Sequence, residues 1–276
     1  MNYSYLLKSK GDVATILFRV VFFFFCFEAL FKLLLRFLPK QPEVLSDATK
    51  LSRERFRVLL SINLISCIHA TVVSFVATYG LFSDEKMYSF VWHLLRWEYE
   101  PLHEQILVVE ETKFCGALVT MTVGYFVWDL YNVGIQEQFD TMMTLHHTIS
   151  IVVWPIALYY GLAHFFLLYS LATELSSPLM HLRWYFRNIY GKEFRWLVTT
   201  VAFVLLFTIV RMVAMPFVLF GLYCSNSWRH SALPPWLQVL STSTLYLPSV
   251  LNLWWYFYTM KMCYNFLCGK NKSKKA

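Results

Sequence analysis

The chain has 276 residues, of which 58% are hydrophobic, 19% aromatic and only 15% charged, and its formal net charge is +7. Apolar runs of about twenty residues recur along it, which is the length that crosses a bilayer and has no use in a soluble domain. The composition therefore excludes an ordinary soluble protein and predicts an all-α, polytopic transmembrane helical bundle. The basic residues cluster in short segments between apolar runs, so we interpret them as a topology signal and expect no nucleic-acid partner.

Seven membrane spans are expected in chain order. Their predicted ranges are 13–38, 59–81, 114–134, 142–162, 164–181, 196–223 and 236–262. The first is too long for the apolar region of a signal peptide and is expected to stay as an anchor. The fifth is the shortest and is closed by Ser-Ser-Pro at 176–178, which predicts a kinked or broken helix.

The distribution of charge predicts the orientation. Lysine and arginine collect after the first, fifth and last spans, whereas the segment 82–113 after the second span is mainly acidic. The positive-inside rule then predicts a lumenal N-terminus and a cytosolic C-terminus. The chain ends in Lys272-Ser-Lys-Lys-Ala276, which matches the K-x-K-x-x signal that retrieves membrane proteins to the endoplasmic reticulum. We predict that location, although any basic tail after a last helix has a similar composition.

The most informative polar residues are His146 and His147, which begin the fourth span. Asp129 in GYFVWDL, Glu174 in ATELSSP and Arg211 in FTIVRMVAM lie in neighbouring spans. A charged side chain at the centre of a membrane helix costs roughly 2.5–3.5 kcal/mol, and residues kept at that cost usually bind or react. Two structural alternatives are open: Asp129 reaches the interface, or Glu174 and Arg211 form an ion pair without further function.

This set of side chains favours acyl transfer. A histidine can deprotonate an amine or hydroxyl that attacks a thioester, and a carboxylate such as Asp129 or Glu174 can orient the imidazole. Arg211 can stabilise a developing oxyanion or bind a phosphate of the substrate. Adjacent helical residues point about 100° apart, so only one histidine can aim squarely at a given partner. We expect acyl-CoA as co-substrate, with no bound cofactor and no metal site.

Five short segments carry a family resemblance. They occur in the expected order as GYFVWDL (124–130), LHHTIS (145–150), ATELSSPLMHLRWYF (172–186), FTIVRMVAM (207–215) and SVLNLWWYF (249–257). The chain resembles the TLC-domain family of membrane proteins. The resemblance implies a six-helix TLC domain over 49–265, preceded by residues 1–48 with an extra N-terminal helix and followed by the basic cytosolic tail 266–276. It also implies a role in lipid metabolism or homeostasis.

Ceramide synthases of this family acylate sphingoid bases from acyl-CoA, and their histidine doublet matches His146 and His147. They carry an acidic segment where this chain reads Tyr169-Ser-Leu-Ala-Thr-Glu174, so the resemblance leaves the acyl acceptor open. Two other functions also stay open. One is a non-enzymatic, lipid-binding regulator of membrane composition, and the other is a cargo receptor or chaperone of the endoplasmic reticulum. The expected partners are membrane lipids, and homo-oligomerisation is left open.

Overall fold

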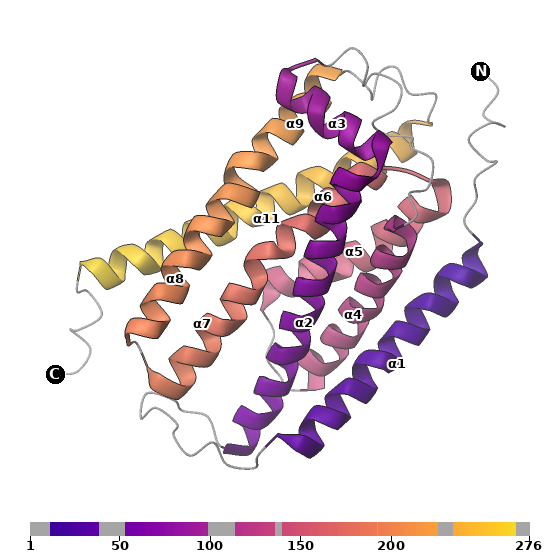
Figure 1. Cartoon of the computed structure of the whole chain (residues 1–276). Coiled ribbons are helices and arrows are strands. Elements are labelled where there is room, and N and C mark those ends of the chain that lie inside the picture. Colours follow the sequence, from indigo (N-terminus) through magenta and orange to yellow (C-terminus); the bar gives the residue numbers. More distant parts are fainter. Residues whose placement is uncertain are drawn as a thin grey trace.

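A computed structural model describes residues 12–38, 53–98, 114–135, 140–191, 193–225 and 234–268. The regular structure in these ranges is helical and forms an elongated bundle (Figure 1), which confirms the predicted all-α class. The dilysine segment Lys272–Ala276 and residues 99–113 of the acidic segment lie outside the described residues. Location and topology therefore stay predictions.

The helices follow the predicted order. The first are α1 (Val13–Phe37), α2 (Arg53–Ser83), α3 (Glu85–Arg96), α4 (Cys115–Ile135) and α5 (Thr141–Tyr160). A long helical run then consists of α6 (His164–Ala172), the 3₁₀ turn η3 (Thr173–Ser176) and α7 (Ser177–Tyr190). Another consists of α8 (Phe194–Phe207), the π-helical segment η4 (Thr208–Val213) and α9 (Ala214–Ser225), and α11 (Pro235–Leu267) closes the described chain.

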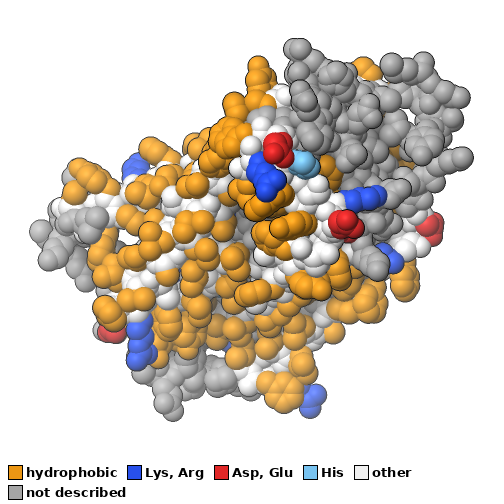
Figure 2. All heavy atoms as spheres, turned by 45° about the horizontal axis from the view of Figure 1, so that its top comes forward, with side chains coloured by type: hydrophobic (Ala, Val, Ile, Leu, Met, Phe, Trp, Pro, Cys, Tyr) orange, Lys and Arg blue, Asp and Glu red, His pale blue; other side chains and the backbone are white. Residues whose placement is uncertain are grey.

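Several of these helices are long and apolar enough to cross a membrane. Among the described residues four qualify by length and hydropathy, over Val13–Phe37, Glu54–Ser83, Thr141–Tyr160 and Phe194–Cys224. Apolar side chains also cover most of the face shown in Figure 2, where charged side chains are sparse. A surface of this kind is suited to lipid and not to water. The chain is therefore a multi-span membrane protein, while the number of seven spans stays a prediction.

An aspartate cap fixes where α5, the helix that carries the histidine doublet, begins. The Oδ1 of Asp140 accepts hydrogen bonds from the backbone amides of Met142 and Met143 at 2.9 and 3.0 Å. These bonds satisfy amides that have no partner within the helix, so α5 starts at Thr141, just before the histidine doublet. The helix ends at Gly161, whose φ of 66° belongs to the left-handed region that glycine adopts without strain.

The fifth predicted span is distorted but continues beyond its expected end. Pro178 has no amide hydrogen to donate to the carbonyl of Glu174, and the amide of Ser177 donates to that carbonyl instead. The helix consequently tightens into η3 and then runs on to Tyr190. The helix thus extends past the predicted end of the span at residue 181, because the proline distorts one turn and does not end the helix.

A short helix that the sequence analysis did not predict, α3, lies in the segment after α2. It buries Met87, Phe90 and Leu94 and contacts both α2 and α9 (Figure 1). Along one flank of the bundle, α1 packs against α4, where Gly124 allows close approach (Figure 1). A Cβ atom at that position would lie 2.7 Å from the carbonyl oxygen of Val20.

Candidate functional site

A cavity of about 380 Å³ lies between α2, α4, α5, the η3–α7 segment, the α8–η4 segment and α11. Its volume is within the range of about 300–1,000 Å³ that is typical of small-molecule sites. All the residues predicted for the site line this one cavity, although they come from distant parts of the chain. They are Asp129, His146, His147, Glu174 and Arg211. Their chemical roles stay predictions.

His147 of α5 faces Asp129 of α4. The Nδ1 atom of the imidazole lies 3.1 Å from Oδ2 of the carboxylate, and both side chains are less than a tenth exposed. The two atoms are within ion-pair distance, but the angle at Nδ1 is not that of a hydrogen bond. The ring stacks on Phe126 with centroids 4.1 Å apart. With Nδ1 beside the carboxylate, Nε2 is the nitrogen available to a ligand.

His146 has a different environment from its neighbour. It is only partly buried, and its ring makes edge contacts with Phe126 and Trp255 at centroid distances of 5.6 and 5.7 Å. The two imidazole centroids are 5.5 Å apart. Consecutive residues of one helix therefore reach the same cavity with different partners, and His147 is the member of the doublet that is paired with a carboxylate.

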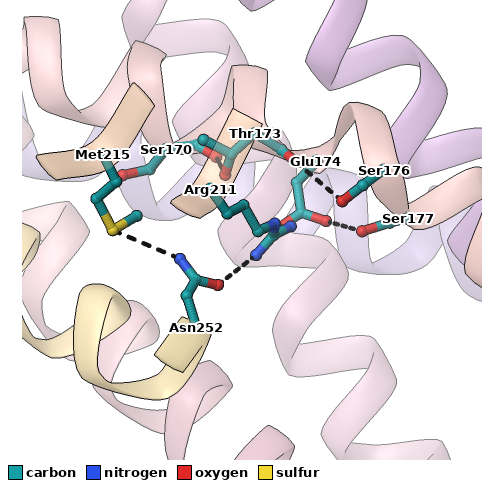
Figure 3. Close-up of polar contacts among 8 residues, drawn as sticks. All are labelled: Ser170, Thr173, Glu174, Ser176, Ser177, Arg211, Met215 and Asn252. Carbon is teal, nitrogen blue, oxygen red and sulfur yellow. Dashed lines mark hydrogen bonds and ion pairs between the residues drawn. The ribbon is translucent and has the colours of Figure 1, made fainter. Parts of the chain in front are cut away.

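Glu174 and Arg211 form the centre of a second polar group (Figure 3). Nη2 of Arg211 lies 3.0 Å from Oε1 of Glu174, and Nη1 donates to Oδ1 of Asn252 at 2.9 Å. The hydroxyl of Ser177 donates to the other carboxylate oxygen, Oε2, at 2.6 Å. The ion pair that was considered as a structural alternative is thus present. Two of the three guanidinium nitrogens are engaged within the protein.

The backbone around both charged residues departs from the α-helix. Glu174 lies in the 3₁₀ turn η3, and Arg211 lies in the π-helical segment η4. A π-turn shifts the hydrogen-bonding pattern and is found frequently at functional sites. The hydroxyl of Tyr169 donates to the carbonyl of Val210 within this segment, at 3.1 Å. No feature of the sequence indicates η4, because its hydrophobic pattern is that of any membrane helix.

The cavity has in addition a polar wall that was not predicted from the sequence. We use this term for Asn63, Ser66, His69, Tyr125 and His181, all of which line the cavity. The hydroxyl of Tyr125 donates to Ser66 at 2.7 Å, and its ring stacks on His69 at 4.0 Å. Nδ1 of His181 donates to Oδ1 of Asn63 at 2.8 Å.

One sequence signal could have revealed part of this wall. Asn63, Ser66 and His69 recur every three residues within an apolar helix, so they follow one helix face. Taken singly they are unremarkable, because isolated polar residues in membrane helices often form hydrogen bonds between helices. The contribution of His181 depends on the distorted α6–α7 run and has no comparable signal.

Comparison with known protein families identifies the family to which the chain belongs. Residues 60–261 match the model of the TLC domain, which covers most of the chain. The chain belongs to the TLC-domain family. The resemblance seen in the five motifs is thereby confirmed, and the TLC-domain match contains all the predicted site residues.

Individual relatives of this TLC-domain protein agree with that assignment. TLC domain-containing protein 4-B of Danio rerio is 24% identical over 220 residues, which is 77% of this chain and 76% of the relative. TLC domain-containing protein 4-A of Xenopus laevis and TLC domain-containing protein 4 of Xenopus tropicalis are each 26% identical over 163 residues. In both cases the match covers 56% of this chain and 62% of the relative. No solved structure matches this chain.

Among the described residues, no group of three or more histidine, cysteine, aspartate or glutamate side chains is arranged to hold a metal ion. The titratable groups predicted for the site are the imidazoles of His146 and His147, the carboxylates of Asp129 and Glu174, and the guanidinium of Arg211. Acid–base chemistry is available from such a set without further assumptions.

Proposed function

We propose that this TLC-domain protein is a membrane acyltransferase that uses acyl-CoA to acylate a lipid acceptor. The observation that carries the proposal is the close pair of His147 and Asp129 on the wall of a cavity whose volume is within the range of small-molecule sites. A carboxylate beside Nδ1 favours the tautomer that carries its proton there and leaves Nε2 as the base. The family membership supports a lipid-related role for the same cavity.

In the proposed reaction, Nε2 of His147 removes the proton from an acceptor hydroxyl or amine as that atom attacks the thioester carbonyl. A bond forms between the acceptor and the carbonyl carbon, and the negative charge moves to the carbonyl oxygen. When this intermediate collapses, the carbon–sulfur bond breaks. The coenzyme A sulfur leaves with the proton that His147 had taken, so atoms and charges balance.

The remaining site residues have supporting roles in this proposal. His146 is held between Phe126 and Trp255 and lines the same cavity, where it can donate a hydrogen bond to the developing oxyanion. Glu174 and Arg211 neutralise each other and hold η3 against η4. We further propose that the protein resides in the endoplasmic reticulum, where the cytosolic ends of its helices would meet acyl-CoA.

The proposal is tested by rescuing cells that lack the protein with variants and comparing their lipidomes. His147→Ala should lower formation of the acylated product about 10²–10⁴-fold, which is the usual contribution of a general base. Asp129→Asn should act in the same direction with a smaller effect. The matched control is His93→Ala, because His93 also lies 3.0 Å from a carboxylate, Glu98, but does not line the cavity.

Two results would contradict acyl transfer. If His147→Ala restored the whole lipidome at normal protein abundance, no histidine-based reaction would be needed. If His146→Ala and His147→Ala failed to restore the lipidome, while the purified wild-type protein bound lipid without converting it, the cavity would be the binding site of a lipid-binding regulator.

A further inference from the structure

Most of the charged side chains that line the cavity are paired with an opposite charge or with backbone amides. Asp129 lies beside His147, and Glu174 lies beside Arg211. The carboxylate of Asp140 caps the amino end of α5 through two backbone amides. The exception among the described cavity residues with a full charge is Arg183 of α7.

The atoms in contact with the Arg183 guanidinium belong to neutral groups, and Arg187, which acts on it electrostatically, carries a charge of the same sign. Nη1 of Arg183 lies 3.4 Å from the thioether sulfur of Met262, and its guanidinium lies 5.6 Å from the centre of the Phe203 ring. A sulfur atom is a weak acceptor, and an aromatic face compensates only part of a cation's lost hydration. The side chain is partly buried, and no carboxylate among the described residues lies within ion-pair distance of it. Within the part of the chain that the structure describes, this guanidinium of the cavity therefore has no counter-ion.

We propose that Arg183 binds a phosphate group of the ligand that occupies the cavity. A guanidinium offers several N–H donors in one plane, an arrangement that suits the oxygens of a phosphate. The inference rests on the proposed function only in that the cavity is taken to be the substrate site. It replaces Arg211 as the phosphate ligand, because two nitrogens of Arg211 are already occupied by Glu174 and Asn252.

The position of Arg183 also suits this role. It lines the cavity together with Tyr258 and Thr259, which lie toward the carboxyl end of α11, and with Asp140 at the start of α5. These are the helix ends that the charge distribution predicts to be cytosolic. A phosphate bound there would leave the rest of the ligand to extend toward the histidine doublet. The Asp140 carboxylate opposes an anion, but the two amides that it caps offset part of its charge.

A phosphate can come from coenzyme A or from a lipid headgroup, and matched ligands separate the two sources. The first pair is palmitoyl-CoA and S-palmitoyl-pantetheine, which lacks phosphate. The second pair is dioleoyl phosphatidic acid and dioleoylglycerol. Equilibrium binding of each ligand is measured with the purified full-length chain in detergent. The variant is Arg183→Met, whose side chain keeps the apolar contacts to Phe203 and Met262, and the control is Arg187→Met, one turn further along the same helix.

We expect the wild-type protein to prefer the phosphate-bearing member of at least one pair. Arg183→Met should reduce that preference about tenfold or more, whereas Arg187→Met should leave it within about threefold. Loss confined to the first pair identifies coenzyme A, and loss confined to the second identifies a lipid phosphate.

The inference is overturned if the wild-type protein shows no preference in either pair, or if Arg183→Met retains it. The first of these outcomes needs no variant, so a folding defect cannot obscure it. Because binding and not turnover is measured, a phosphate preference that depends on Arg183 would stand even if acyl transfer were never found. A missing preference would not by itself exclude acyl transfer from a donor without phosphate.

Discussion

At the scale of single residues, the Glu174–Arg211 pair shows how the bundle tolerates charge. The arginine side chain is 7% exposed and the glutamate 25%, so both have lost most of their hydration. Such a pair adds little net stability over apolar residues of similar volume, because desolvation offsets the attraction. Replacing only one of the two residues is destabilising, since the remaining charge would be buried without a partner.

Arg211→Met is therefore expected to destabilise the protein by about 3–5 kcal/mol, whereas Glu174→Gln with Arg211→Met should lose much less. Thermal unfolding of the purified protein in detergent measures both. The control is Lys32→Met, which breaks an ion pair with Glu28 at a lysine that is 73% exposed and should cost less than about 1 kcal/mol. Equal destabilisation by the single and double variants would show that the two charges are not coupled.

The five proposed site residues that line the cavity were recognisable in the sequence from the cost of placing them in a membrane. His146, His147, Asp129, Glu174 and Arg211 stand out because each is polar within an apolar run. His69 and His181 do not, because one polar side chain in a helix is explained equally well by a hydrogen bond to a neighbouring helix. Only the fold shows that these residues and the doublet face the same cavity.

At the scale of helices, the sequence predicts where the apolar runs lie but not how their backbones deviate. Pro178 indicated a disturbance of the fifth span, and the structure shows one 3₁₀ turn where a break was an alternative. The helix α3 was missed because its apolar residues span only 12 positions, too few to cross a membrane, and charged residues surround them. Contacts between helices depend on small residues whose importance is visible only when both partners are placed.

Gly124 is such a residue. Gly124→Ala would place a methyl group 2.7 Å from the carbonyl oxygen of Val20 and 2.8 Å from Cβ of Phe23, so α1 must move away from α4. We expect destabilisation by about 1–3 kcal/mol, as for overpacking in a core, measured by thermal unfolding in detergent.

Gly80→Ala is the matched control, since its new methyl group would meet no atom closer than 3.7 Å. It should leave stability unchanged or raise it slightly through helix propensity. If both glycine variants unfolded at the same temperature as the wild type, the α1–α4 contact would contribute nothing to stability.

At the scale of the whole molecule, composition and the spacing of apolar runs were sufficient to predict a helical membrane bundle. The exposed surface agrees, because large apolar side chains cover it on α1, α8, α9 and α11. The cavity could not be predicted, since its shape depends on the crossing of helices that are far apart in the sequence. Part of its polar lining was nevertheless anticipated, because buried polar residues tend to gather where water or a ligand can reach them.

The predicted location is testable at this scale. Deleting Lys272–Ala276 should move the protein from the endoplasmic reticulum to later membranes of the secretory pathway, as seen by fluorescence microscopy of a tagged chain. Replacing only Lys272 and Lys274 by alanine should have the same effect if the spacing of the signal matters. Unchanged localisation of both variants would leave the tail as an ordinary basic segment.

The π-helical segment η4 also sets the relative rotation of the two helices that it joins. A π-turn contains about one residue more than an α-turn, and one residue corresponds to about 100° around a helix axis. Without that extra residue, α9 would be rotated relative to α8 by this angle. Met215, Val218 and Leu222, which are buried, would then turn away from the bundle. The extra residue in η4 therefore corrects the rotation of α9 relative to α8. As a result, the same continuous helix can direct Arg211 into the cavity and bury the apolar face of α9 against the bundle.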